Sequence, residues 1–282
     1  MLEIDQFTYG WLTPGLAYVM SVIGSLLALR CIVRARANPG HRGWIVTAAV
    51  ALGGTGVWVM HFIAMLGFSV HGATIRYNIP ITLMSVALAI AVVWAGLTLV
   101  LRRGTSALLT GGAVTGVGVA AMHYAGMYAM KTDVTMRYDP WLVLVSLVIA
   151  VVAATAALWF ALHVEGVPAT VGSAMIMGVA VCGMHYTGMY AMQAHMSEHM
   201  AAPSGAQAGQ LLTPLIIGVS MVTLLLFLQV GITDIHEPDL SRIRGQRASR
   251  YWPSSTSIDP EDDDRFVTGA YPPVDDGGQH RR

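Results

Sequence analysis

One short motif recurs at a fixed interval inside long apolar stretches, and this repeat most strongly limits what the chain can fold into. Met122-His-Tyr-Ala-Gly-Met-Tyr-Ala-Met130 is followed by Met184-His-Tyr-Thr-Gly-Met-Tyr-Ala-Met192, and Met60-His-Phe-Ile-Ala-Met65 precedes both as a looser copy. The three histidines are His61, His123 and His185, so the spacing is 62 residues each time. A period this strict indicates an architecture of repeated structural units.

The apolar stretches around the motif are long enough to cross a membrane. Charged residues make up 11% of the chain, whereas soluble domains carry about 25%. Only helices and closed barrels satisfy the backbone in lipid, and these runs are too long for strands across about 30 Å of hydrocarbon. We therefore expect an all-α membrane protein with seven transmembrane helices, at residues 14–34, 44–67, 80–101, 105–130, 141–162, 169–192 and 211–233.

The odd-numbered helices share a starting proline followed by a serine five to seven residues later. Proline in the first turn of a helix costs no hydrogen bond. The repeated unit is thus an odd helix plus an even helix, used three times, and the seventh helix is a closing copy. All units enter and leave the membrane in the same sense, so the repeats are parallel and differ from the inverted repeats of many transporters. The prolines and serines are Pro14 with Ser21, Pro80 with Ser85, Pro140 with Ser146, and Pro214 with Ser220.

Basic residues gather in alternate loops and predict the orientation. Arginines follow the first, third and seventh helices, and the other loops have fewer of them or balance them with acids. The positive-inside rule then places the N-terminus outside and the C-terminus in the cytoplasm. The arginines concerned are Arg34, Arg36, Arg42, Arg102, Arg103, Arg242, Arg244, Arg247 and Arg250.

The chain changes in character after residue 233. Residues 234–282 begin with basic residues, become acidic through residues 259–264, and contain few aliphatic side chains. Such a segment cannot bury enough apolar surface to order itself. We predict a membrane module over residues 1–233 and a disordered cytoplasmic tail over residues 234–282.

The motif also predicts a metal site. Each histidine lies at about the same depth in its even helix, near the outer boundary of the hydrocarbon, and a methionine four residues later shares its helix face. Imidazole and thioether together suit copper, above all Cu(I), and the spans hold no carboxylate for harder cations. The predicted stripes are His61 with Met65, His123 with Met127, and His185 with Met189.

Small residues would help these stripes to meet. Gly54, Gly116 and Gly178 each stand seven residues before a motif histidine. Small residues let helix backbones approach closely in lipid. We expect these glycines to bring the even helices together, so that the three stripes point into one site.

A structural interpretation of the same residues competes with the metal site. Methionine often fills irregular gaps in apolar cores. Tyr124, Tyr128, Tyr186 and Tyr190 are placed where an aromatic belt at a membrane interface would be. A histidine within a membrane can simply bond to a neighbouring hydroxyl or carbonyl, although polar residues at membrane depth are functional candidates by default.

The chain resembles the MHYT-domain family of bacterial integral membrane sensors. The resemblance rests on Met122-His-Tyr-Ala and Met184-His-Tyr-Thr with the variant Met60-His-Phe-Ile, and covers about residues 8–233. It implies a bacterial plasma membrane protein that senses a diatomic gas (oxygen, carbon monoxide or nitric oxide) through bound copper. The ligands implied by the motif are Met60 with His61, Met122 with His123, and Met184 with His185.

Two departures from the family pattern matter. Phe62 replaces the motif tyrosine in the first copy, so a role for that hydroxyl cannot be threefold. Many relatives also carry a cytoplasmic output domain, whereas residues 234–282 are too few and too polar for one. We therefore expect a separate cytoplasmic signalling protein as the output partner.

Other functions remain as alternatives or are excluded. A copper uptake permease or a periplasmic copper acceptor would use the same soft ligands, and a haem protein would need two facing histidines. Retinal is excluded because the seventh helix has no lysine. The sequence offers no nucleophile–base pair, which argues against an enzyme, and the zero net charge gives no reason to expect a nucleic acid partner. Cys31 and Cys182 are not expected to form a disulfide.

Overall fold

The computed structural model of the protein describes residues 2–37, 42–102, 104–196 and 203–236, the last five of them by their backbone alone. The chain divides into two units, Met1–Thr233 and Asp234–Arg282. The tail predicted for residues 234–282 lies outside the described residues from residue 237 onward. That prediction therefore stays a prediction.

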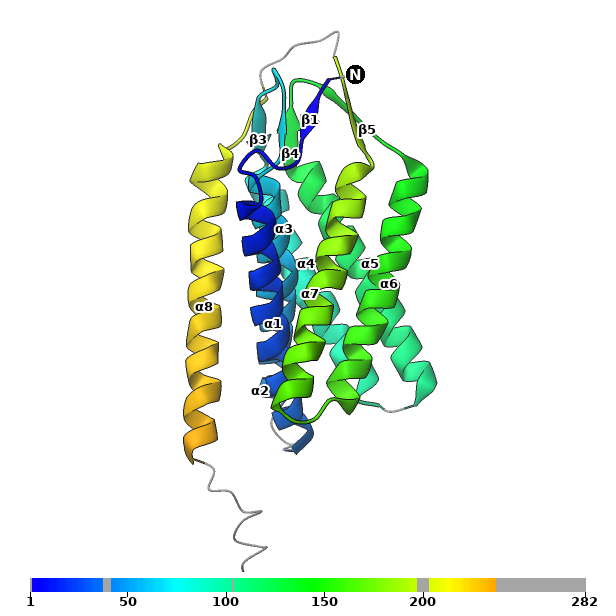
Figure 1. The fold of residues 1–282 in the computed structure, drawn as a ribbon, viewed down its shortest axis with the longest axis vertical. Coiled ribbons are helices and arrows are strands. Elements are labelled where there is room, and N and C mark those ends of the chain that lie inside the picture. The colour runs from blue at the N-terminus through cyan, green and yellow to red at the C-terminus, as the bar shows by residue number, and fades with distance from the viewer. Residues whose placement is uncertain (1, 38–41, 103, 197–202, 237–282) are drawn as a thin grey trace, which may run out of the picture. The chain divides into compact units, whose positions relative to one another are not determined.

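Seven helices in the described residues are long and apolar enough to cross a membrane (Figure 1), which confirms the predicted seven-helix membrane architecture. The second span is continuous but has three parts, with a π-helical segment in its middle. The spans are α1 (Leu12–Ala37), the second span of α2 (Gly43–Ala49), η1 (Val50–Val59) and α3 (Met60–Leu66), then α4 (Ile79–Val100), α5 (Thr105–Ala129), α6 (Pro140–His163), α7 (Val167–Tyr190) and α8 (Ala208–His236).

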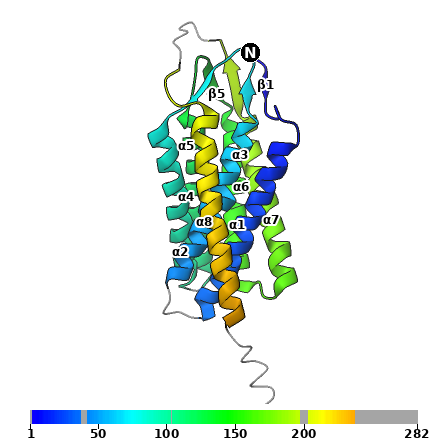
Figure 2. The same cartoon turned by 90° about the vertical axis from the view of Figure 1, so that its left-hand side faces the viewer.

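The first six spans pack in a closed ring. Contacts run from α1 to the second span, then through α4, α5, α6 and α7 back to α1. The last helix, α8, stands outside this ring (Figure 1) and faces the viewer in Figure 2. Helix α8 contacts the second span at two places: Val219 is the side chain nearest to Gly54, and the Thr223 hydroxyl forms a hydrogen bond with the Thr55 hydroxyl. The second span is consequently the most buried of the seven.

Short strands close each repeat at one end of the ring, which we call the strand end (Figure 1). The strand before each odd helix pairs antiparallel with the strand after the even helix of the same repeat. Sequence reasoning missed these strands because each has only two to four residues. They are β1 (Ile4–Asp5) with β2 (Ser69–Val70), β3 (Ile75–Tyr77) with β4 (Met130–Thr132), and β5 (Thr135–Tyr138) with β6 (Met192–His195).

Equivalent hydrogen bonds fasten the two helices of each repeat together. A backbone N–H just before or at the start of the odd helix donates to a carbonyl at the end of the even helix. In two repeats the donor residue is also the N-cap of the odd helix, where Asn78 accepts from the Ile81 N–H and Asp139 from the Trp141 N–H. These caps satisfy donors that a helix start otherwise leaves open. The fastening bonds are Thr8 to Gly67 at 3.0 Å, Asn78 to Ala129 at 2.8 Å, and Asp139 to Ala191 at 2.8 Å.

The role predicted for three glycines is wrong. Gly116 lies against the Val151 backbone of α6, and Gly178 lies against side chains of α1. Gly54 has Val219 of α8 as its nearest neighbour. These glycines therefore bring each even helix close to an odd helix or to α8. A ring of six helices places an odd helix between every two even ones, so the even helices meet through longer side chains instead.

Candidate metal centre

Three histidines from the three repeats meet inside the ring near the strand end. His61 comes from α3, His123 from α5 and His185 from α7, each five or six residues before its span ends. Their side chains are at most 1% exposed. The structure thus brings together all three histidines that the sequence singled out. Within the described residues they form the one group of three His, Cys, Asp or Glu side chains close enough to share a metal ion.

The three imidazoles are arranged with approximate threefold symmetry. Their Nδ1 atoms form a triangle with sides of 3.0 Å, 3.1 Å and 3.3 Å. Neighbouring ring centroids lie 4.9–5.0 Å apart, and the ring planes cross at 81–82°. Each ring therefore turns the same nitrogen toward one common point.

This triangle cannot be satisfied by protons alone. Each Nδ1 atom is either protonated and a donor or unprotonated and an acceptor. With three atoms and two states, at least two of the three must be alike, so at least one side of the triangle joins two donors or two acceptors. That conflict is costly in a buried site, because electrostatic repulsion is stronger in the low dielectric of a protein interior.

A cation at the centre would remove this conflict. The centre of the triangle lies about 1.8 Å from each Nδ1, which is the mean side divided by √3. Zinc–imidazole bonds measure about 2.0–2.1 Å, so a small outward movement of each ring gives a bonding distance. All three lone pairs would then point at one ion. The donor set fits a metal bound by three neutral imidazoles.

The outer nitrogens of two rings lie against glycines of the next repeat. A Cβ atom built on Gly126 would lie 2.4 Å from Nε2 of His61, and one on Gly188 would lie 2.4 Å from Nε2 of His123. Neither Nε2 atom has a hydrogen-bond partner among the described residues. Metal-binding histidines usually donate this second N–H to a protein group. Here packing against bare backbone holds the rings instead.

The six predicted methionine ligands are all buried. They belong to the same apolar core and are at most 2% exposed. Burial in this core does not distinguish a metal-ligand role from simple packing. The ligand role of these methionines therefore stays a prediction. They are Met60, Met65, Met122, Met127, Met184 and Met189.

In the first two repeats a side chain beside the motif histidine bonds to a serine of the next odd helix, whereas the Tyr186 hydroxyl of the third repeat has no hydrogen-bond partner among the described residues. The Tyr124 hydroxyl bonds with the Ser146 hydroxyl of α6 at 2.6 Å. In the first repeat Phe62 lacks a hydroxyl, and the Trp58 indole instead donates to Ser85 of α4 at 2.9 Å. Trp58 lies one turn before Phe62 and so reaches the same kind of partner. The serine pattern of the odd helices signalled these contacts, but their partners only became evident from the packing.

A porphyrin does not fit between these histidines. Bis-histidine ligation places the haem plane between two imidazoles on opposite faces of the iron. The Nδ1 atoms here contact each other directly, at 3.0–3.3 Å. The geometry therefore suits a bare ion and disfavours the haem alternative.

Outside the spans, a buried phenol borders the site. Tyr77 of β3 packs its ring against that of Phe62, with centroids 6.3 Å apart. Burial raises the pKa of the Tyr77 hydroxyl above its usual range. The strand end therefore adds no charge at this position.

Fold and site together define a multi-pass membrane protein in which three tandem repeats each contribute one histidine to a buried centre. Comparison with known protein sequences identifies the family to which such a protein belongs. The MHYT family, described as a bacterial signalling protein N-terminal repeat, matches residues 54–113, 116–174 and 178–237. The chain belongs to this family, as its motifs predicted.

Curated relatives are signalling proteins of bacteria. The chain is 32% identical over 236 residues to the bifunctional diguanylate cyclase/cyclic di-GMP phosphodiesterase MucR of Pseudomonas aeruginosa, covering 80% of this chain and 34% of MucR. It is 33% identical to the cyclic di-GMP phosphodiesterase NbdA of the same organism, covering 67% of this chain and 25% of NbdA. The signalling protein YkoW of Bacillus subtilis is 30% identical, with 70% and 25% covered. The chain thus spans about a third or less of these relatives. No solved structure matches it.

Proposed function

We propose that this protein is a copper-binding membrane sensor, in which His61, His123 and His185 hold the ion. The observation that carries the proposal is the Nδ1 triangle, whose three lone pairs have no mutual arrangement without conflict. Membership of a family of signalling repeats supports a sensory role. The bound copper would respond to a diatomic gas (oxygen, carbon monoxide or nitric oxide) or to a change in redox state.

Copper is preferred over other metals because of the side chains in the surrounding core. Imidazole suits several transition metals, whereas thioether sulfur selects soft ions such as Cu(I). The core around the histidines contains eight methionines of the repeated motifs, six of them at the positions of the predicted ligands. We propose Met60, Met122 and Met184, and the i+4 methionines Met65, Met127 and Met189, as additional or alternative ligands.

A resident ion is favoured over a transported one. Conduction requires binding sites from which the ion can leave, at several depths. The described residues contain one cluster of three or more His, Cys, Asp or Glu side chains that could hold a metal ion, and it is buried in the core. A copper acceptor or an uptake protein is therefore the second candidate.

The sensor would act through a partner and would itself be no enzyme. The relatives named above include enzymes of cyclic di-GMP, and they extend well beyond the region they share with this chain. We propose a separate cytoplasmic signalling protein as the output partner. We place the module in the bacterial plasma membrane, with its N-terminus outside and its C-terminus in the cytoplasm.

Metal analysis of the purified protein tests this function. Wild-type protein is expected to bind one Cu(I) per chain, and replacement of all three histidines by alanine should abolish that binding. The control is His163→Ala, which removes an exposed histidine at the opposite end of α6 and should leave the copper content unchanged.

The gas response is tested on the same preparations. Copper-loaded wild-type protein should bind carbon monoxide, with an infrared band that the triple variant lacks. Wild-type protein without stoichiometric copper, or a triple variant that retains it, would refute the proposed function.

A further inference from the structure

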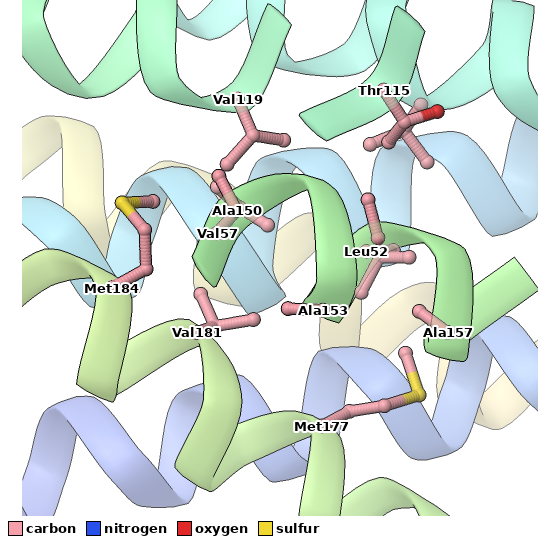
Figure 3. A pocket seen from close by; sticks show the side chains of 12 residues that line it. Leu52, Val57, Thr115, Val119, Ala150, Ala153, Ala157, Met177, Val181 and Met184 are labelled. Atoms are coloured by element: carbon pink, nitrogen blue, oxygen red, sulfur yellow. The ribbon is translucent and has the colours of Figure 1, made fainter. Parts of the chain in front are cut away.

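An apolar cavity of about 40 Å³ lies among the helices of the ring (Figure 3). Three of its lining residues, Val57, Val119 and Val181, occupy equivalent positions in the three repeats. Each stands four residues before a motif histidine, which is about one helical turn and the same helix face. The cavity is therefore next to the histidine centre, on the side away from the strand end.

One lining residue connects the cavity directly to the motif. Met184 lines the cavity and is followed in the chain by His185. In Figure 3, Val119 of α5 and Val181 of α7 point toward the space between their helices, and alanines of α6 border the same space. Small side chains such as Ala150 and Ala154 leave this volume unfilled.

The cavity is large enough for water but unsuited to it. About 10–15 Å³ is enough to hold one water molecule, which then needs two to four polar partners. Among the described residues that line the cavity, Thr115 alone has a polar side chain, and its hydroxyl already donates to the Val92 carbonyl at 3.4 Å. Cavities of this kind stay dry and take up apolar guests such as xenon.

We propose that this cavity is a docking site for a neutral diatomic gas, which reaches the histidine centre from there. A small apolar molecule dissolves in the hydrocarbon of the membrane and loses no hydrogen bonds on entering an apolar cavity. The passage of the gas to the metal rests on the proposed function. Gas binding in the cavity itself does not depend on it.

Xenon binding to metal-free protein tests the cavity without involving copper. Wild-type protein in detergent should show saturable xenon binding by ¹²⁹Xe NMR. Ala154→Leu fills the cavity and should remove that binding, whereas Leu52→Ala enlarges it and should increase xenon affinity. The matched control is Ala156→Leu, the same change on α6 at a position outside the lining.

Carbon monoxide rebinding to the copper-loaded protein tests the route. After flash photolysis, Ala154→Leu should rebind carbon monoxide about tenfold more slowly, equivalent to about 1.4 kcal/mol on the barrier. Ala156→Leu should rebind at the wild-type rate. The wild-type protein, Ala154→Leu and Ala156→Leu should all have the same copper content.

The outcomes separate the two proposals. Wild-type protein without saturable xenon binding would overturn the cavity proposal. Unchanged xenon affinity in Leu52→Ala would also overturn it, and this second test remains available if Ala154→Leu fails to fold. A wild-type rebinding rate in folded Ala154→Leu would overturn the route. Xenon binding by a wild-type protein that takes up no copper would refute the proposed function and still support the gas-binding cavity.

Discussion

Two glycines of the repeated motif fix the position of the imidazoles. Gly126 and Gly188 leave room for the Nε2 edges of His61 and His123, each of which would lie 2.4 Å from a Cβ atom at the glycine. The first repeat has Ala64 at the corresponding position. Ring position matters because three Nδ1 atoms must converge on a single point, and an error of a few tenths of an ångström is comparable to the tolerance of a metal–nitrogen bond.

Replacing either glycine by alanine should weaken the proposed metal site without removing a ligand. In Gly126→Ala the new Cβ would lie 2.4 Å from Nε2 of His61, so the ring has to move. We expect copper affinity to fall about 10- to 100-fold, the range typical of changes behind a ligand. Competition with a Cu(I) chelator measures this affinity. Gly172→Ala is the control, since a Cβ there meets nothing within 4 Å; equal affinities in both variants would contradict the prediction.

At the scale of elements, close helix packing and a π-helical segment define the second span. A Cβ atom on Gly24 of α1 would lie 2.4 Å from the backbone nitrogen of Gly56 in η1. Gly53 is similarly close to the Ala89 carbonyl of α4. The π-helical segment ends at Val59, directly before Met60 and His61. Because such segments recur at functional sites, the packing of η1 bears directly on the centre.

The contact between α1 and η1 predicts a large difference between two similar substitutions. Gly24→Ala should lower the free energy of unfolding by about 1–3 kcal/mol, as overpacking of a close contact does. Gly15→Ala in the same helix meets nothing within 4 Å and should be neutral or slightly stabilising. Denaturation in mixed micelles measures both. Gly24→Ala as stable as Gly15→Ala would show that the two helices can separate without cost.

At the scale of the whole molecule, the two ends of the ring differ in kind. The strand end carries the three two-stranded sheets, the chain start and the nearby histidine centre. The opposite end carries Arg36 in the last turn of α1, together with Arg42 and Arg102, and Arg36 lies 3.8 Å from Glu165. The positive-inside rule predicts that the arginine-bearing end faces the cytoplasm. The proposed metal site would then lie nearer the outside.

Reporter fusions test this orientation. Alkaline phosphatase joined after Thr132, at the strand end, should be active because it is exported. The same reporter after Arg102 or Glu165 should be inactive, and green fluorescent protein at those two positions should fluoresce. The opposite pattern of activity would invert the topology and place the histidine centre nearer the cytoplasm.

The sequence by itself determined the membrane class, the number of spans, the repeat and the three histidines. These properties follow from local information, since hydrophobic length sets a span and a repeated motif sets equivalent positions. The serine pattern of the odd helices was also visible there. Its partners were not, because Trp58 substitutes for the hydroxyl that Phe62 lacks only when the two helices are packed together.

Only the tertiary structure decided how the repeats meet. The order of helices around the ring directs Gly54, Gly116 and Gly178 toward α8 and the odd helices, contrary to the expectation from spacing. It also turns the Nδ1 atom of each histidine inward and leaves an apolar cavity one turn away. A sequence period fixes which residues are equivalent, but ring orientation and unfilled volume depend on side chains from several helices at once. The frustrated triangle of His61, His123 and His185, and with it the case for a metal, arises at that level.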